Sequence, residues 1–146
     1  MRRVAFLLLA LLVLGGCGGG SDTALTREEY ASKADAICTK YNEQTNALPR
    51  PANLSDLGES ADKTRDILDN AVDDLKDLKP PAREQATADQ WIAAVEQLEG
   101  DLEEIRDGAN EHNMAAVQAV VPRATEHNKR ANELATQLGL TVCNKD

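Results

Sequence analysis

The spacing of small and aliphatic residues between Leu57 and Leu78 constrains the fold of this chain more than any other feature. These residues alternate at steps of four and three positions, which places them on one stripe of an α-helix. They are Leu57, Ala61, Thr64, Leu68, Ala71, Leu75 and Leu78. Because other helices have to cover a stripe of this kind, the segment predicts a packed helical domain.

The segment before this helix has its own start and stop signals. Glu29 follows Thr26 at the spacing of a capping box, in which each side chain accepts a hydrogen bond from the other residue's backbone amide. Pro49 and Pro51 end the helical pattern behind it. We therefore expect a first helix between these two signals.

Two more helical segments follow the striped one. The third carries Trp91 on its apolar face, has Pro81 expected in its first turn and breaks up after Gly108. The fourth begins after Asn113 as its N-cap, and Gly139 is placed to end it in a left-handed turn. With the first two, these segments make four predicted helices.

The four predicted helices have similar lengths, about 33–39 Å each at 1.5 Å per residue. Short connections containing Pro or Gly join them, as is typical of an up-down helix bundle. No long segment has the alternation of a β-strand. We therefore assign residues 26–146 to one all-α domain, an antiparallel four-helix up-down bundle, and expect it to be a monomer.

Residues 1–16 have the layout of a secretory signal peptide. Two arginines precede an apolar stretch at positions 4–14, and two glycines follow it. The alternative is a buried core helix that ends in a free cysteine. The opening arginines and the closing glycines favour the signal peptide.

The residues that follow predict a lipid anchor. Leu14-Gly15-Gly16-Cys17 resembles a bacterial lipobox, in which the cysteine is diacylated and the preceding peptide is removed. Two acyl chains are enough for stable membrane attachment. Residues 17–25 begin with a Gly-rich run that is typical of flexible tethers. We predict lipidation of Cys17, a tether over 17–25 and a location on the extracytoplasmic face of the cell membrane.

The remaining cysteines favour a disulfide. With Cys17 lipidated, Cys38 and Cys143 form an even pair in an oxidising compartment, and a bridge between them would close most of the domain. The competing interpretation makes one thiol a catalytic nucleophile with His112 or His127 as its base. We favour the bridge.

Composition argues against nucleic-acid partners. The chain carries 25 acidic and 16 basic residues, a net charge of −9. Phosphate recognition needs clustered lysines and arginines instead. The aromatic residues after the signal peptide are Tyr30, Tyr41 and Trp91, too few to form a stacking platform for bases or sugars.

The charged residues of the helices predict solvent-exposed faces. Asp101 is expected on such a face, as are the aspartates opposite the apolar stripe of the second helix. Those aspartates are Asp62, Asp66, Asp69, Asp73 and Asp77. His112 and His127 are fifteen positions apart, too far along one helix to share a metal ion. We expect no metal, no cofactor and no catalytic residue.

Two short motifs resemble those of a loose family of small actinobacterial lipoproteins and secreted proteins. Its members share a first helix with Tyr-x7-Cys, as Tyr30 and Cys38 here, and a Leu-Gly-Leu-x-x-Cys end, as residues 138–143 here. Asn144 departs from the Gly that usually follows the last cysteine. The resemblance covers about residues 25–145. It implies an envelope-located helical domain with a terminal disulfide and no settled activity.

These features favour a non-enzymatic interaction or structural module, anchored to the membrane by its lipid and facing a protein partner in the cell envelope. The alternative is a small-ligand or lipid carrier with a pocket between the helices near Trp91. Trp91 is more simply a core residue. A pocket above about 300 Å³ at that place would favour the carrier.

Overall fold

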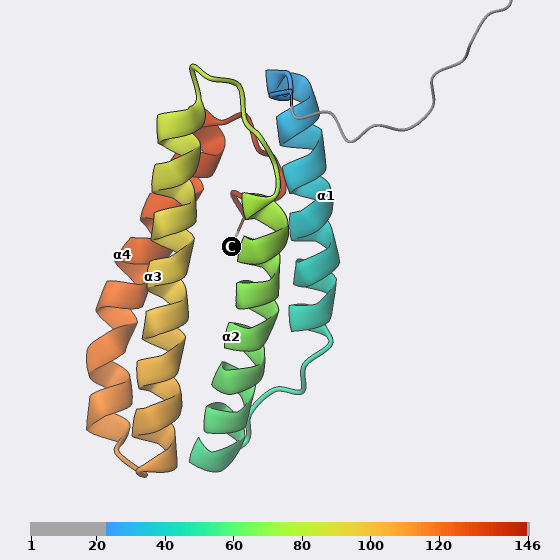
Figure 1. Cartoon of the computed structure of the whole chain (residues 1–146). Helices are drawn as coiled ribbons and strands as arrows, with labels where there is room; N and C mark the ends of the chain where they lie inside the picture. Colours follow the sequence, from blue (N-terminus) through green and yellow to red (C-terminus); the bar gives the residue numbers. More distant parts are fainter. Residues whose placement is uncertain (1–22, 146) are drawn as a thin grey trace, which may run out of the picture.

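The computed structural model describes residues 23–145, which form four helices and no strand. The helices are α1 (Arg27–Asn46), α2 (Leu54–Lys76), α3 (Gln85–Asn110) and α4 (Met114–Gln137). Consecutive helices run in opposite directions (Figure 1). The predicted all-α, antiparallel four-helix bundle is confirmed. The predicted signal peptide and Cys17 lie outside the described residues.

Local signals define three of the four helix starts. The Thr26 hydroxyl accepts a hydrogen bond from the Glu29 amide at 3.2 Å, and the Glu29 carboxylate accepts one from the Thr26 amide at 2.9 Å. This is the expected capping box of α1. Asn53 caps α2 and Asn113 caps α4 through their side-chain oxygens.

The start and the end of α3 differ from the prediction. Pro81 lies in a turn that precedes the helix, where its carbonyl accepts a hydrogen bond from the Glu84 amide at 2.8 Å. Glu84 is the N-cap residue and makes no side-chain capping bond. Gly108 does not interrupt the helix, because it is buried where α4 comes close: a Cβ added there would lie 3.2 Å from the Val117 side chain.

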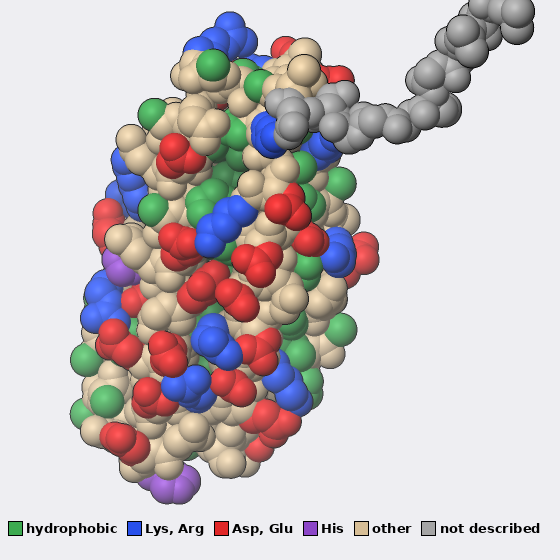
Figure 2. All heavy atoms as spheres, in the orientation of Figure 1, with side chains coloured by type: hydrophobic (Ala, Val, Ile, Leu, Met, Phe, Trp, Pro, Cys, Tyr) green, Lys and Arg blue, Asp and Glu red, His purple; other side chains and the backbone are tan. Residues whose placement is uncertain are grey.

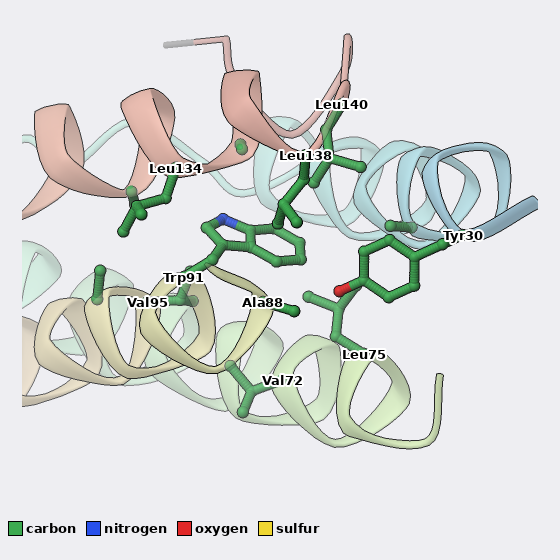
Figure 3. Packing of buried hydrophobic residues seen from close by; sticks show 13 residues of the cluster. Tyr30, Val72, Leu75, Ala88, Trp91, Val95, Leu134, Leu138 and Leu140 are labelled. Carbon is green, nitrogen blue, oxygen red and sulfur yellow. The ribbon is translucent and has the colours of Figure 1, made fainter. Parts of the chain in front are cut away.

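The main core lies toward the end of the bundle where the chain enters α1. The Trp91 ring, 2% exposed, occupies its centre. Figure 3 shows it between Leu134 and Leu138 on one side and Val95 and Ala88 on the other, with Tyr30 beyond. Trp91 is therefore a core residue, as the simpler interpretation expects.

The helices pack in chain order. α1 lies against α2, α2 against α3 and α3 against α4, but α1 and α4 form no comparable interface. The segment after α4 crosses from the end of that helix to α1 (Figure 1). The fourth side of the bundle is thus joined by a short segment of turns and bends instead of an extensive helix pair.

Gly139 turns the chain toward α1. Its φ of +81° is a left-handed conformation that residues with a Cβ rarely adopt. The Leu140 amide donates to the Ala135 carbonyl at 2.9 Å, and the Gly139 amide donates to the Thr136 carbonyl at 3.0 Å. This is a Schellman motif. It also buries Leu140 in the core.

A disulfide then ties this segment to α1. Cys38 and Cys143 are bonded, with their Cα atoms 5.4 Å apart. Because Cys38 lies in α1 and Cys143 follows α4, the closed loop contains α2, α3, α4 and the second half of α1. The predicted bridge is confirmed, and both cysteines pack against the core.

Asp35 holds the same segment through hydrogen bonds. Its carboxylate accepts from the backbone amides of Thr141, Val142 and Cys143 at 2.9–3.3 Å, and from the Thr141 hydroxyl at 2.7 Å. We call these groups the tail clamp. Partial burial by itself would raise the pKa of Asp35, but the hydrogen bonds from residues 141–143 outweigh it and lower the pKa.

Reduction of the disulfide should destabilise the domain without necessarily unfolding it. The bridge closes a loop of about 100 residues and restricts the unfolded chain, so its loss should cost about 2–4 kcal/mol. For a domain of this size the melting temperature should fall by about 10 °C. Calorimetry with and without reductant measures the change. A Cys38→Ser/Cys143→Ser variant should not respond to reductant, and an unchanged wild-type melting temperature would contradict the prediction.

Asp35→Asn should lower the free energy of unfolding by about 2 kcal/mol at neutral pH, because the tail clamp loses hydrogen bonds to a charged acceptor. The pKa of Asp35 is lower in the folded protein than in the unfolded chain. The clamp therefore contributes fully above about pH 4 and is lost as the pH falls through the folded pKa.

Denaturant unfolding of wild type and Asp35→Asn at pH 7 and at pH 3 tests this. The difference in unfolding free energy between wild type and Asp35→Asn should be smaller at pH 3 than at pH 7. Asp73→Asn, at an exposed position of α2, is the matched control and should change stability by less than about 0.5 kcal/mol. Equal effects of the two substitutions would argue against the clamp.

Candidate functional site

Of the predicted site residues, the two described cysteines are joined to each other. Cys38 and Cys143 share a disulfide, so neither sulfur is a free thiol in this structure. The interpretation of one of them as a nucleophile with a histidine base is therefore not supported. Cys17, the predicted lipidation site, lies outside the described residues.

The histidines lie far apart in the fold. His112 forms the turn between α3 and α4 with a φ of 56°. His127 lies in the middle of α4, and the two histidine patches are well separated on the surface (Figure 2). The described residues contain no group of three or more histidine, cysteine or acidic side chains that could hold a metal ion.

The prediction that Asp101 lies on the surface is wrong. Asp101 is 3% exposed, and both carboxylate oxygens contact α4. One accepts a hydrogen bond from Arg123 Nε at 2.8 Å, and the other lies 2.7 Å from His127 Nδ1. Arg123 also pairs with Glu104 at 2.7 Å. A buried carboxylate requires such partners.

The sequence contains a signal for the burial of Asp101. Trp91, Ala94, Leu98, Ile105 and Gly108 follow steps of three and four residues, with a gap of seven between Leu98 and Ile105. Asp101 fills that gap, three positions after Leu98 and four before Ile105. The position of Asp101 on the apolar stripe therefore indicates that it is buried, although a charged side chain is usually exposed.

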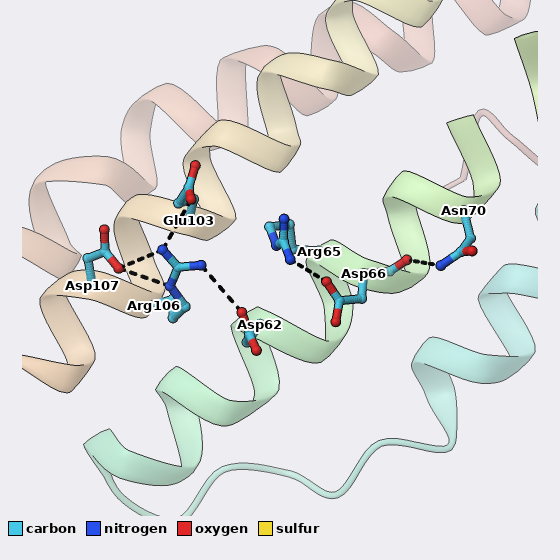
Figure 4. A network of polar contacts seen from close by, with 7 residues as sticks. All are labelled: Asp62, Arg65, Asp66, Asn70, Glu103, Arg106 and Asp107. Carbon is cyan, nitrogen blue, oxygen red and sulfur yellow. Dashed lines mark hydrogen bonds and ion pairs between the residues drawn. The ribbon is translucent and has the colours of Figure 1, made fainter. Parts of the chain in front are cut away.

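The aspartates of α2 are mostly exposed, as predicted, but Asp62 has a partner in α3. Arg106 lies between the two helices and pairs with Asp62 at 3.4 Å (Figure 4). It also contacts Glu103 at 3.1 Å and Asp107 at 2.8 Å. The hydrogen bond to Asp107 is the largest of the effects that raise the pKa of Arg106. This network ties the surface of α2 to that of α3.

A cavity lies beside Trp91, on the side where α1 and α4 do not pack together. Its volume is about 170 Å³, and all four helices and the C-terminal segment contribute to its wall. The disulfide forms part of that wall. A cavity is therefore present at the place predicted for a ligand pocket, but it is smaller than the expected 300 Å³.

The described surface has other hollows. One, of about 510 Å³, is a groove of Thr, Asn, Lys and Glu side chains between α4 and Asn144. A second, of about 230 Å³, lies between the end of α1 and the start of α2 and is lined by charged side chains together with Leu48 and Pro49. Another, of about 360 Å³, lies at the end of the bundle formed by the α1–α2 connection and the start of α4. It includes Leu54, Leu57 and Met114, whose side chains are apolar.

Comparison with known proteins finds no relative. No family model matches the chain, and neither a curated protein nor a solved structure does. Among the described helices, none is both long enough and apolar enough to cross a bilayer. The family resemblance therefore depends on the short motifs around the two bridged cysteines.

Proposed function

We propose that the protein is a lipid-anchored module of a bacterial cell envelope, which holds a helical domain on the extracytoplasmic face of the membrane and acts by binding an envelope partner instead of by catalysis. The observation that carries the proposal is the Leu-Gly-Gly-Cys sequence at residues 14–17, directly followed by a Gly-rich run. Diacylation of Cys17 would attach the chain stably.

The geometry of the domain is compatible with a tether at one end. The Leu25 amide donates to the Lys79 carbonyl at 2.8 Å, which fixes the chain just before α1 at the end of the bundle where α2 stops. An anchor at Cys17 would hold this end near the membrane. The opposite end would lie about 39 Å away, the length of the 26-residue α3.

The end far from the tether carries the feature that best suits a partner. Met114 is 47% exposed there and borders the hollow that contains Leu54 and Leu57. Over much of the visible face acidic and basic side chains are interleaved, with hydrophobic side chains between them mainly in its upper half (Figure 2). Exposed apolar side chains within a charged surface are common at protein interfaces.

The alternative function, a lipid carrier, is less favoured. The cavity beside Trp91 has a volume of about 170 Å³. Pockets for drug-sized ligands range from about 300 to 1,000 Å³, and an acyl chain needs comparable room. The carrier proposal would need a substantial opening of the helices.

Cys17→Ala should abolish acylation and membrane retention, since it removes the only atom of the lipobox that can carry the acyl chains. Labelling the producing cells with a clickable palmitate, followed by fractionation, measures both effects. Cys38→Ser/Cys143→Ser is the control that removes the other cysteines and should stay labelled and membrane-bound. Wild-type protein that takes up no label would refute the lipid anchor.

A photoreactive amino acid at position 114 should crosslink to an envelope partner in intact cells, because Met114 lies at the exposed apolar end. The matched control is the same amino acid at Glu28, an exposed position in the first turn of α1 near the tether. Mass spectrometry identifies the crosslinked protein. Equal crosslinking from both positions, or none from position 114, would contradict a partner at this end.

A further inference from the structure

The cavity beside Trp91 has the form of a small binding site. Its floor is the apolar seam of α2 and α3, which contributes Leu68, Trp91 and Leu98 among others. Residues of α1 and α4 form its sides, and the C-terminal segment with Cys143 and Lys145 forms one end. The cavity lies on the side of the bundle where α1 and α4 form no interface comparable to those of the other neighbouring helices.

The charge of the wall differs from that of the whole protein. The chain has a net charge of −9, yet none of the residues that line the cavity is acidic. One of them, Lys145, carries a positive charge, and its side chain is exposed at the rim. The other polar groups include the side-chain amides of Asn42, Asn128 and Asn132. Such a wall disfavours a cation and suits an anionic or neutral polar group next to an apolar body.

The volume limits the size of that apolar body. A cavity of about 150 Å³ lined by aliphatic and aromatic side chains takes up one benzene molecule. The present cavity, at about 170 Å³, is close to that size. It is far too small for a helix of a partner protein, and its walls leave no room for a full acyl chain.

We propose that this cavity binds a small aromatic carboxylate, with the ring against Leu68 and Leu98 next to the buried Trp91 and the carboxylate at the rim toward Lys145. Burial of the ring supplies most of the affinity, because its apolar surface leaves water. The carboxylate keeps part of its hydration at the open rim, where the ammonium group attracts it. This inference does not depend on the lipid anchor or on a protein partner.

Trp91 makes the proposal directly measurable, because it is the only tryptophan of the chain. Phenylacetate, phenylacetamide and phenethylamine serve as probes that share one ring and differ in the charge of the polar end. They are titrated into the full chain in phosphatidylcholine vesicles, and the fluorescence of Trp91 is recorded. Phenylacetate should cause a saturable change with a Kd of about 1 mM, as expected for ten non-hydrogen atoms. The amine should bind more weakly than the acid by at least about twofold to fivefold, since the one charge of the wall repels it instead of attracting it.

Two kinds of variant test the two parts of the site separately: one fills the apolar space for the ring, and the other removes the positive charge of Lys145. Ala71→Phe fills the cavity and should remove the response to both acid and amide. Leu98→Phe, at a half-buried position of the wall, does the same if Ala71→Phe fails to fold. Lys145→Gln should weaken phenylacetate binding by about twofold to fivefold, the range of an exposed ion pair, and leave the amide unchanged. Lys129→Gln, an exposed lysine of α4 outside the cavity, is its control.

Three results would overturn the proposal. One is the absence of a saturable fluorescence change with phenylacetate up to about ten times the expected Kd. Another is equal or stronger binding of the amine. The third is unchanged binding of phenylacetate in a folded variant whose cavity is filled.

Discussion

The attachment of the C-terminal segment to α1 is the interaction on which this bundle depends. α2 is the helix with which α1 forms its main interface, and Tyr30 and Ala34 of α1 also reach the shared core. Groups outside the helix pairs add to the position of α1. The Cys38–Cys143 bridge and the carboxylate of Asp35 join it to the segment after α4. At the end of the bundle Arg27 adds an ion pair with Glu84 at 3.0 Å and a hydrogen bond to the Gln137 carbonyl at 2.8 Å. The covalent bond adds to the packing of Leu140 and of the two cysteines on this side.

The cavity is a consequence of the same arrangement. A four-helix bundle usually fills its interior with side chains from all four neighbouring pairs. Here the C-terminal segment is thinner than a helix, and it covers the seam of α2 and α3 only in part, so Trp91 and the disulfide border a space of about 170 Å³. The disulfide and the cavity thus both belong to the side of the bundle that the C-terminal segment covers.

Polar groups determine how α3 meets its neighbours. Asp101 is buried against Arg123 and His127 of α4, while Arg106 reaches Asp62 of α2. A buried ion pair contributes little net stability, because removal of its charges from water is costly. A wrong helix register would leave the Asp101 carboxylate buried without partners, which costs much more. These contacts therefore contribute little to the stability of the native alignment, but they make other alignments of the helices much less stable.

Sequence patterns alone were sufficient to predict the four helices, most of their ends and the pairing of the cysteines. The capping box at Thr26 and the glycine turn at Gly139 depend on residues within one helical turn, so they can be read locally. The burial of Asp101 was missed because residue type was weighed above its place on the apolar stripe of α3. The separation of α1 from α4, and with it the cavity volume, was decided only by the tertiary structure. Distances between helices depend on how side chains of all four pack together, and no local pattern contains that information.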